Sequence, residues 1–157
     1  MRPAVYNETT IVSYLTSEAS NDIRVMANIN ATTEWWETRK PEFEIFVSEF
    51  VVAEASQGDA AAARRRMKVI DDIPELNVAQ EARTLAKALI SEGPIPGSAE
   101  TDAYHIAVAT VNGMDYLLTW NCSHIANAVM RPGVEAVCRN HGYEPPTICT
   151  PLELMEE

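Results

Sequence analysis

The sequence predicts a single α/β domain over residues 1–157, in which a small, mostly parallel sheet is flanked by helices on both faces. Three observations carry this prediction. Short apolar runs alternate along the chain with longer amphipathic segments, as strands and helices do in such domains. A length of 157 residues fits one domain and is enough to bury a core. Polar side chains follow the apolar runs, at the strand ends where open α/β sheets build their sites.

The pattern is clearest in the last third of the chain. Apolar residues recur at three- and four-residue spacing over 99–112, which predicts an amphipathic helix. Asp102 lies in its first turn, where the helix dipole favours negative charge. Gly113 follows this helix, and 114–118 is short and apolar enough for an interior strand. A carboxylate at a helix start is thereby placed beside the polar residues that follow a strand.

Hydrophobic periodicity and chain breakers place the other elements. Thr9 and Thr10 are candidate caps for the first helix, and Ser48 and Asp59 for the third and fourth. The expected strands are 4–8, 43–47, 114–118 and 147–150. The expected helices are 10–17, 21–39, 49–57, 60–71, 78–91, 99–112 and 125–141, the last with a candidate interruption at 131–133.

The charge balance argues against a broad nucleic-acid-binding surface. The chain has 12 Lys and Arg residues against 23 Asp and Glu residues, a net charge of −11. Nucleic-acid binders usually carry a basic surface. Three interpretations stay open, namely a soluble acidic protein, a nucleic-acid enzyme whose acids gather around metal ions, and an acidic surface for a basic protein partner.

The composition also bears on the compartment. No run of about 18 apolar residues occurs, so we expect no membrane-spanning helix. The first ten residues lack the apolar region of a secretory signal. The three cysteines are widely spaced and fit neither a zinc motif nor a disulfide framework. We therefore expect a reduced, cytoplasmic protein.

Three acids, Glu8, Glu54 and Asp102, are each predicted at or near a helix start, or where a strand passes into a helix. Carboxylates brought within a few ångströms repel one another, so at least one should have a raised pKa. Proteins keep such trios chiefly to hold Mg²⁺ or Mn²⁺, which stabilise phosphate charge during phosphodiester hydrolysis. For each acid alone, the alternative is a cap that complements the helix dipole.

Five segments carry a more specific signal through their order and spacing. They are VYNETT at 5–10, SEFVVAE at 48–54, TDAYHIAVA at 101–109, LTWNCSHI at 118–125 and TPLEL at 150–154. Over nearly the whole chain they resemble the motifs of the PIN-domain family, of the small prokaryotic kind that includes VapC-type toxins. The family's acids fall at Glu8, Glu54 and Asp102, and its Asp or Asn in the fourth motif falls at Asn121. The usual first acid is Asp, and many members carry an acid at the position of His124.

The resemblance implies a three-layer PIN-like fold and a metal-dependent endoribonuclease that hydrolyses RNA. It places Mg²⁺ or Mn²⁺ on Glu8, Glu54 and Asp102 and adds Asn121 as a fourth catalytic residue. It also implies the toxin of a type II toxin–antitoxin pair, with an antitoxin partner and a homodimer. The alternative is a PIN-like binding module that acts through protein contacts, which the departures at Glu8 and Asn121 favour.

Four further side chains are expected around the acids. Thr10 and Thr119 can hold a carboxylate or a water through their hydroxyls, or act as caps. His105 lies one helical turn after Asp102 and either supports the site or is a core histidine. His124 either orients a phosphate or a ligand, or is a capping residue on the surface.

The chain has one concentration of positive charge, on the helix expected at 60–71. It consists of Arg64, Arg65, Arg66 and Lys68. These side chains either form a solvated helix face or contact the phosphates of RNA or an acidic partner segment.

Overall fold

The computed structural model describes residues 1–155 and confirms the predicted α/β architecture. The four strands of the described chain are β1 (Ala4–Asn7), β2 (Glu44–Phe46), β3 (Tyr116–Leu118) and β4 (Thr147–Cys149). Its α-helices are α1 (Thr9–Leu15), α2 (Ile23–Thr38), α3 (Glu49–Ala55), α4 (Ala60–Ile70), α5 (Gln80–Ser91), α6 (Glu100–Val111) and α7 (Arg131–Asn140). Short 3₁₀-helices η1 (Lys40–Glu42), η2 (Gly97–Ala99) and η3 (Pro151–Leu154) complete the path.

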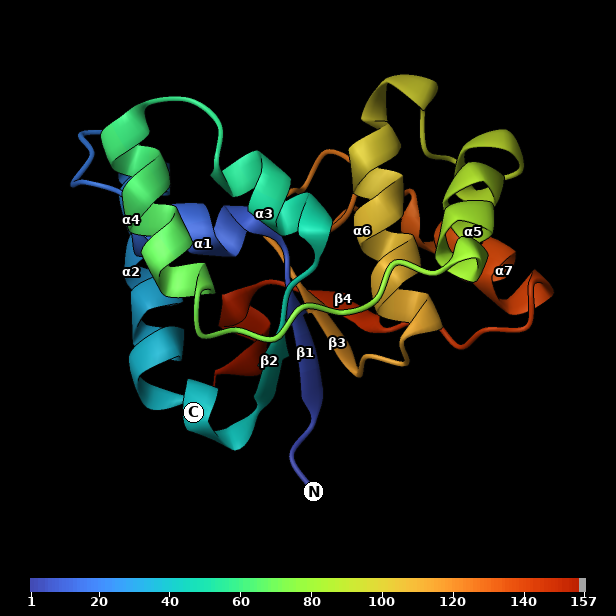
Figure 1. Ribbon diagram of the computed structural model, residues 1–157, viewed down its shortest axis with the longest axis horizontal. Helices are drawn as coiled ribbons and strands as arrows, with labels where there is room; N and C mark the ends of the chain where they lie inside the picture. Colours follow the sequence, from blue (N-terminus) through green and yellow to red (C-terminus); the bar gives the residue numbers. More distant parts are fainter. Residues whose placement is uncertain (156–157) are drawn as a thin grey trace.

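The sheet is parallel throughout, in the order β2-β1-β3-β4. Strand β1 lies in its interior, where Val5 pairs with Ile45 on one side and with Tyr116 on the other. Each of the first three strands is therefore followed by a segment that returns along the outside of the sheet before the next strand begins. Figure 1 shows the strands at the centre, with α1 to α4 gathered on one side and α5, α6 and α7 on the other.

Side chains alternate between the two faces of the sheet, and each face has its own core. On one face Tyr6 and Leu117 pack in the larger cluster with residues of α5, α6 and α7. On the opposite face Val5 and Leu118 pack with Trp35 of α2. All five side chains are fully buried. Helices cover both faces, as the sequence predicted.

The helix expected at 125–141 begins only at Arg131. Asparagine side chains explain the difference, because they bond to the backbone in competition with a helix. Asn127 accepts from the N–H groups of Val129 and Met130, and the segment before it forms turns. Pro132 lies in the first turn of α7, where its missing N–H costs nothing. The expected interruption is therefore the start of the helix.

Two further local predictions were wrong. Neither Thr9 nor Thr10 caps α1, because Glu8 occupies the cap position and its side chain accepts from the N–H of Thr10. Glu54 lies in the last turn of α3 and not near a helix start. The other boundaries agree to within two or three residues, the scatter expected at frayed ends.

Across residues 1–155, none of the helices combines the length and apolar character needed to cross a membrane. The thiols of Cys122, Cys138 and Cys149 are free. Burial raises the pKa of the Cys138 and Cys149 thiols.

Candidate active site

Glu8 lies where β1 passes into α1, at the carboxyl end of the central strand. Its side chain is almost fully buried, with 3% of the residue exposed. Oε1 accepts hydrogen bonds from the hydroxyls of Thr10, at 2.6 Å, and Thr119, at 2.7 Å, and from the Thr10 N–H at 3.2 Å. Within residues 1–155 no hydrogen bond reaches Oε2. One oxygen of Glu8 is thus held in place while the other keeps its lone pairs available.

Glu54 reaches the same region from the last turn of α3. Its Oε1 accepts from the Thr9 hydroxyl at 2.6 Å and lies 2.5 Å from Nε2 of His105. As with Glu8, the structure gives no partner to Oε2 among the described residues. Burial raises the pKa of the Glu54 carboxyl, but hydrogen bonds from His105 and Thr9 and the attraction of His105 outweigh it, so the pKa lies below its usual range. Crowding of three carboxylates would have shifted it in the opposite direction.

His105 is fully buried on α6, and both its ring nitrogens have partners. Nδ1 lies 2.7 Å from the Tyr6 hydroxyl, and Nε2 faces Glu54. The Tyr6 hydroxyl lies 2.8 Å from Oγ of Ser48, the residue that caps α3. Burial, followed by the charges of Glu8 and Glu54, raises the pKa of Tyr6, so its hydroxyl stays neutral. A hydrogen-bonded chain therefore links the start of α3 to the carboxylate near its end.

Asp102 lies in the first turn of α6 and is held by two donors. Oδ1 accepts from Nδ2 of Asn121 at 3.0 Å, and Oδ2 lies 2.9 Å from Nδ1 of His124. The other amide atom of Asn121, Oδ1, accepts from the His124 N–H at 3.1 Å. Both amide atoms of Asn121 are thus engaged, and this residue orients Asp102 and His124.

The groups around Glu8 and Asp102 form one network. Oγ1 of Thr119 donates to Glu8 and accepts from the backbone N–H of Asn121 at 2.9 Å. Oγ1 of Thr10 accepts from the backbone N–H of Trp120 at 2.8 Å while it too donates to Glu8. The segment that follows β3 is thereby fastened across the end of β1. The network contains six of the predicted site residues, namely Glu8, Thr10, Asp102, Thr119, Asn121 and His124. Glu54 and His105 form a separate hydrogen-bonded pair that approaches Glu8.

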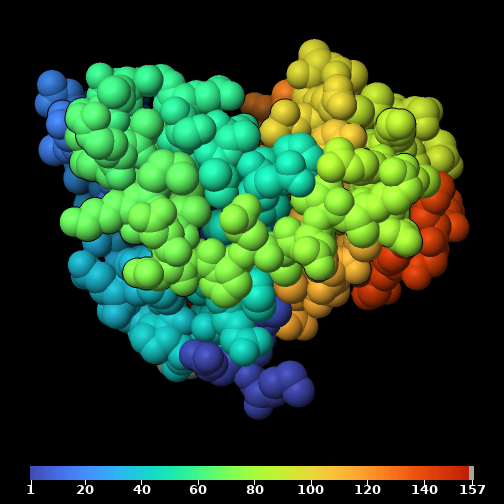
Figure 2. All heavy atoms as spheres, in the orientation of Figure 1, coloured from blue at the N-terminus to red at the C-terminus, as the bar shows by residue number. Residues whose placement is uncertain are grey.

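One ligand atom from each of Glu8, Glu54 and His105 lies within 4.8 Å of the other two. This group could hold a metal ion, and it differs from the predicted trio by having His105 in the place of Asp102. Among residues 1–155, Asp102 is not part of such a group and borders it through Asn121 and Thr119. Figure 2 shows that the surface is hollowed between the lobe of α3 and α4 and the lobe of α6.

Three residues that form hydrogen bonds in the site were not among the site residues predicted from the sequence. Tyr6 and Ser48 reach the Nδ1 side of His105, and Thr9 holds Glu54. For Tyr6 a signal existed, because a tyrosine two residues before the acid lies in the same strand and its hydroxyl requires a buried partner. For Ser48 and Thr9, the expected capping role was already a sufficient explanation.

No protein-family model matches the chain, and no curated protein matches its sequence. Among solved structures, this chain is similar to a chain of VapBC2 from Rickettsia felis. The structure of VapBC2 was determined bound to a DNA fragment from the VapBC2 promoter. The superposition has a TM-score of 0.59 and covers 94% of this chain and 98% of that chain, at 12% sequence identity. The chain has a PIN-like fold. At this identity the likeness shows the fold alone.

In this PIN-like fold Arg64, Arg65 and Arg66 of α4 point in different directions, because successive residues of a helix are rotated by about 100°. Arg66 bonds to the backbone oxygens of Ala55, at 2.9 Å, and Gln57, at 2.6 Å, at the end of α3. Arg65 donates to the Thr16 oxygen at 3.3 Å. Arg64 and Lys68 are exposed. Arg66 therefore supports the helix that carries Glu54, and the exposed members remain candidates for RNA or partner contacts.

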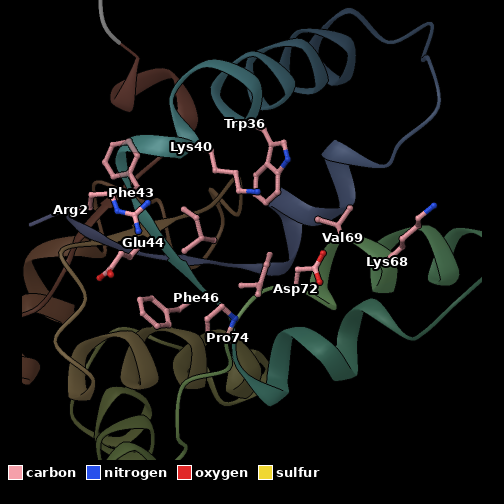
Figure 3. Close-up of a pocket in the computed structure, with 12 residues that line it drawn as sticks. Arg2, Trp36, Lys40, Phe43, Glu44, Phe46, Lys68, Val69, Asp72 and Pro74 are labelled. Carbon is pink, nitrogen blue, oxygen red and sulfur yellow. The ribbon is translucent and has the colours of Figure 1, made fainter.

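A pocket of about 500 Å³ lies away from the carboxylates at the outer edge of β2. Its walls come from α2, η1 and the end of α4, and Lys40 lies over the ring of Trp36 with Nζ 4.0 Å from the ring centre (Figure 3). Of the predicted functional residues within the described chain, Lys68 alone lines it. The convergent polar groups lie elsewhere, near the carboxyl ends of β1 and β3.

Proposed function

We propose that this chain is a metal-dependent endoribonuclease that hydrolyses phosphodiester bonds of RNA. One observation carries the proposal. Two carboxylates from different elements, Glu8 and Glu54, converge with His105 at the carboxyl end of a parallel sheet, where α/β domains build their sites. The PIN-like fold and the order of its acidic motifs support the same reaction class.

The donor set suits a divalent cation. Glu8 and Glu54 each fix one oxygen by hydrogen bonds and leave the other without a described partner, which preorganises two oxygens for an ion. We assign Mg²⁺ or Mn²⁺ as the cofactor class, with Glu8 and Glu54 as ligands and Asp102 at the border of the site. A bound cation supplies stabilisation of the negative charge that develops on the phosphate.

The chain also provides a group for proton transfer. Asp102 contacts Nδ1 of His124 and not Nε2, so the second ring nitrogen is available for proton transfer. The side chain of His124 is 36% exposed. In the proposed hydrolysis, the oxygen of a water bonds to phosphorus and one ester bond to phosphorus breaks. Nε2 of His124 takes a proton from that water, and the proton then passes to the departing ester oxygen. The hydrogen bonds of Asn121 hold Asp102 and His124 in a fixed relative orientation.

We further propose a cytoplasmic toxin of a type II toxin–antitoxin pair that forms a homodimer. The structural neighbour supports a partner, because VapBC2 is named as a complex and was solved on its promoter DNA. The acidic net charge of −11 suits a basic partner segment. Light scattering of the purified chain, alone and after coexpression with a candidate antitoxin, tests the homodimer and the pairing separately.

Cleavage of a single-stranded RNA oligonucleotide in Mg²⁺, in Mn²⁺ and in a chelator tests the enzymatic function. Glu54→Gln should lower the rate at least about 100-fold by removing a charged ligand. Glu49→Gln is the matched control, because Glu49 is exposed on the same helix. His124→Gln should lower the rate by about 10²–10⁴-fold. If the native chain cleaves no RNA in either metal, the binding-module interpretation replaces this one.

A further inference from the structure

His105 offers the carboxylate pair a nitrogen ligand. It lies on α6 with its whole side chain buried, and Nε2 emerges beside Oε1 of Glu54. The acid expected to complete the metal site, Asp102, has both oxygens engaged by the donors of Asn121 and His124. The third ligand atom closest to the pair is therefore a nitrogen of His105 and not an oxygen of Asp102.

The partner of Nδ1 decides whether His105 can bind a cation. A histidine binds metal through a nitrogen that carries no proton, so its one proton must sit on the other nitrogen. Here Nδ1 faces the hydroxyl of Tyr6, which can either donate or accept. When the Tyr6 hydroxyl donates to Nδ1, the proton of His105 is on Nε2, and Nε2–H donates a hydrogen bond to Glu54. When Tyr6 accepts from Nδ1–H, Nε2 presents its lone pair.

Ser48 makes the second arrangement available. Its hydroxyl oxygen lies 2.8 Å from the Tyr6 oxygen and accepts from the Phe50 N–H. The Tyr6 hydroxyl can therefore turn its own proton toward Ser48 while it accepts from His105. A carboxylate or carbonyl at the same place would hold Nδ1 in one state, whereas two hydroxyls allow both. The pKa of Tyr6 is not involved, since the hydroxyl stays neutral throughout.

We propose that Nε2 of His105 joins Glu8 and Glu54 as a metal ligand and gives this site a preference for imidazole-binding metals such as Zn²⁺ over Mg²⁺. Imidazole nitrogen suits Zn²⁺, while sites of oxygen ligands alone suit Mg²⁺. Tyr6 is the positioning residue, because its hydroxyl oxygen accepts the hydrogen bond from Nδ1–H of His105. The inference rests on the proposed nuclease for its biological role, although the binding itself can be measured without RNA.

Electron spin-echo spectroscopy of bound Mn²⁺ tests the ligand directly, because a coordinated imidazole nitrogen modulates the echo. We expect this modulation in the native chain and in His124→Gln, and its loss in His105→Gln. Absence of the modulation from the native chain, or its loss in His124→Gln, would overturn the proposal. Circular dichroism establishes that each variant is folded.

Calorimetric titration with Zn²⁺ and Mg²⁺ gives the second measurement. Tyr6→Phe keeps the ring and removes the hydroxyl, so it tests the assignment even if His105→Gln does not fold. The loss of this outer partner should weaken Zn²⁺ binding by about 10–100-fold. Mg²⁺ binding should change less, so the ratio of the two affinities falls. An unchanged ratio in Tyr6→Phe contradicts the proposed role of the hydroxyl.

The two proposals fail in different ways. A chain that cleaves RNA in Mg²⁺ and shows no nitrogen coordination remains a nuclease with a site of oxygen ligands alone. A chain that shows nitrogen coordination but cleaves no RNA keeps the metal site and loses the proposed function. Asp102→Asn separates the two ligand sets, because it should leave the nitrogen modulation in place.

Discussion

Nε2 of His105 lies 2.5 Å from Oε1 of Glu54, although 51 positions separate the two residues in the chain. This contact joins the first turns of α6 to the last turn of α3. It helps to hold the pKa of Glu54 below its usual range, and it competes with the proposed binding of a cation by His105. Both consequences can be measured.

The first prediction concerns acid stability. The pKa of Glu54 is lowered in the folded state, so its contribution to stability is present above the unfolded pKa of about 4.3 and is lost as the pH falls through the folded value. The native chain should be more stable than Glu54→Gln at pH 6, and the difference should shrink below about pH 4. Urea unfolding from pH 6 to pH 3 measures it. Two parallel stability curves would contradict the assignment.

The second prediction concerns the hydroxyl of Thr119, which donates to Glu8 and accepts from the Asn121 N–H. Thr119→Val keeps the shape, removes one of the three donors to Glu8 and leaves the Asn121 N–H without its described partner, so it should cost about 1–3 kcal/mol of unfolding free energy. Thr119→Ser retains the hydroxyl and should cost less. Urea denaturation of both variants checks this, and equal losses would mean that packing, not hydrogen bonding, dominates.

The third prediction concerns the neutral side chain at position 121. Asn121→Asp replaces the donor to Asp102 with a second carboxylate at 3.0 Å. Repulsion should destabilise the fold at pH 7 in a chelator by about 1–3 kcal/mol. A divalent ion should recover part of that loss, since it binds the folded state only. Thermal unfolding with and without Mn²⁺ gives the comparison, in which an undiminished melting temperature in the chelator would count against the contact.

The fourth prediction separates two neighbouring arginines. Arg66→Gln removes the bonds to the carbonyl oxygens of Ala55 and Gln57 and should cost about 1–2 kcal/mol. Arg64→Gln, on the exposed surface of the same helix, should stay within about 0.5 kcal/mol of the native chain. Chemical denaturation measures both, and equal effects would show that Arg66 does not support α3.

The fifth prediction concerns RNA binding. Arg64 and Lys68 are exposed and lie four positions apart on α4, on the same side of the helix. If they contact phosphates, Arg64→Gln with Lys68→Gln should weaken binding and reduce the slope of log K against log salt by about 0.7 for each lost contact. Filter binding at several salt concentrations tests this. An unchanged slope would assign both residues to a solvated helix face.

The strands and most helices followed from hydrophobic periodicity and from the breakers between them. The helix expected before Arg131 did not form, because Asn127 bonds to backbone N–H groups that a helix would have used. Periodicity records only where apolar residues fall, so it could not reveal this competition.

The position of Glu8 and Asp102 near one edge of the sheet was predictable, because strand ends and helix starts meet there. The approach of Glu54 was not predictable on that ground, because it comes from the last turn of α3. The pairing of His105 with Tyr6 was not predictable either, since it joins residues 99 positions apart and depends on which way one side chain points from α6. The carboxylate of Asp102 was expected to bind the metal. In the structure its two oxygens contact Asn121 and His124 instead. A pattern of residue types along the sequence does not determine which donor forms a hydrogen bond with a given carboxylate oxygen in the folded chain.

The place of β1 inside the sheet has a consequence for how the protein is made. The ribosome synthesises β1 more than 100 residues before its neighbour β3, which ends at residue 118. Contacts of such long separation form slowly and late. Glu8 receives its bond from Thr119 only after that strand is in place. A growing chain therefore carries Glu8 without a formed site until synthesis has passed Thr119, 111 positions later.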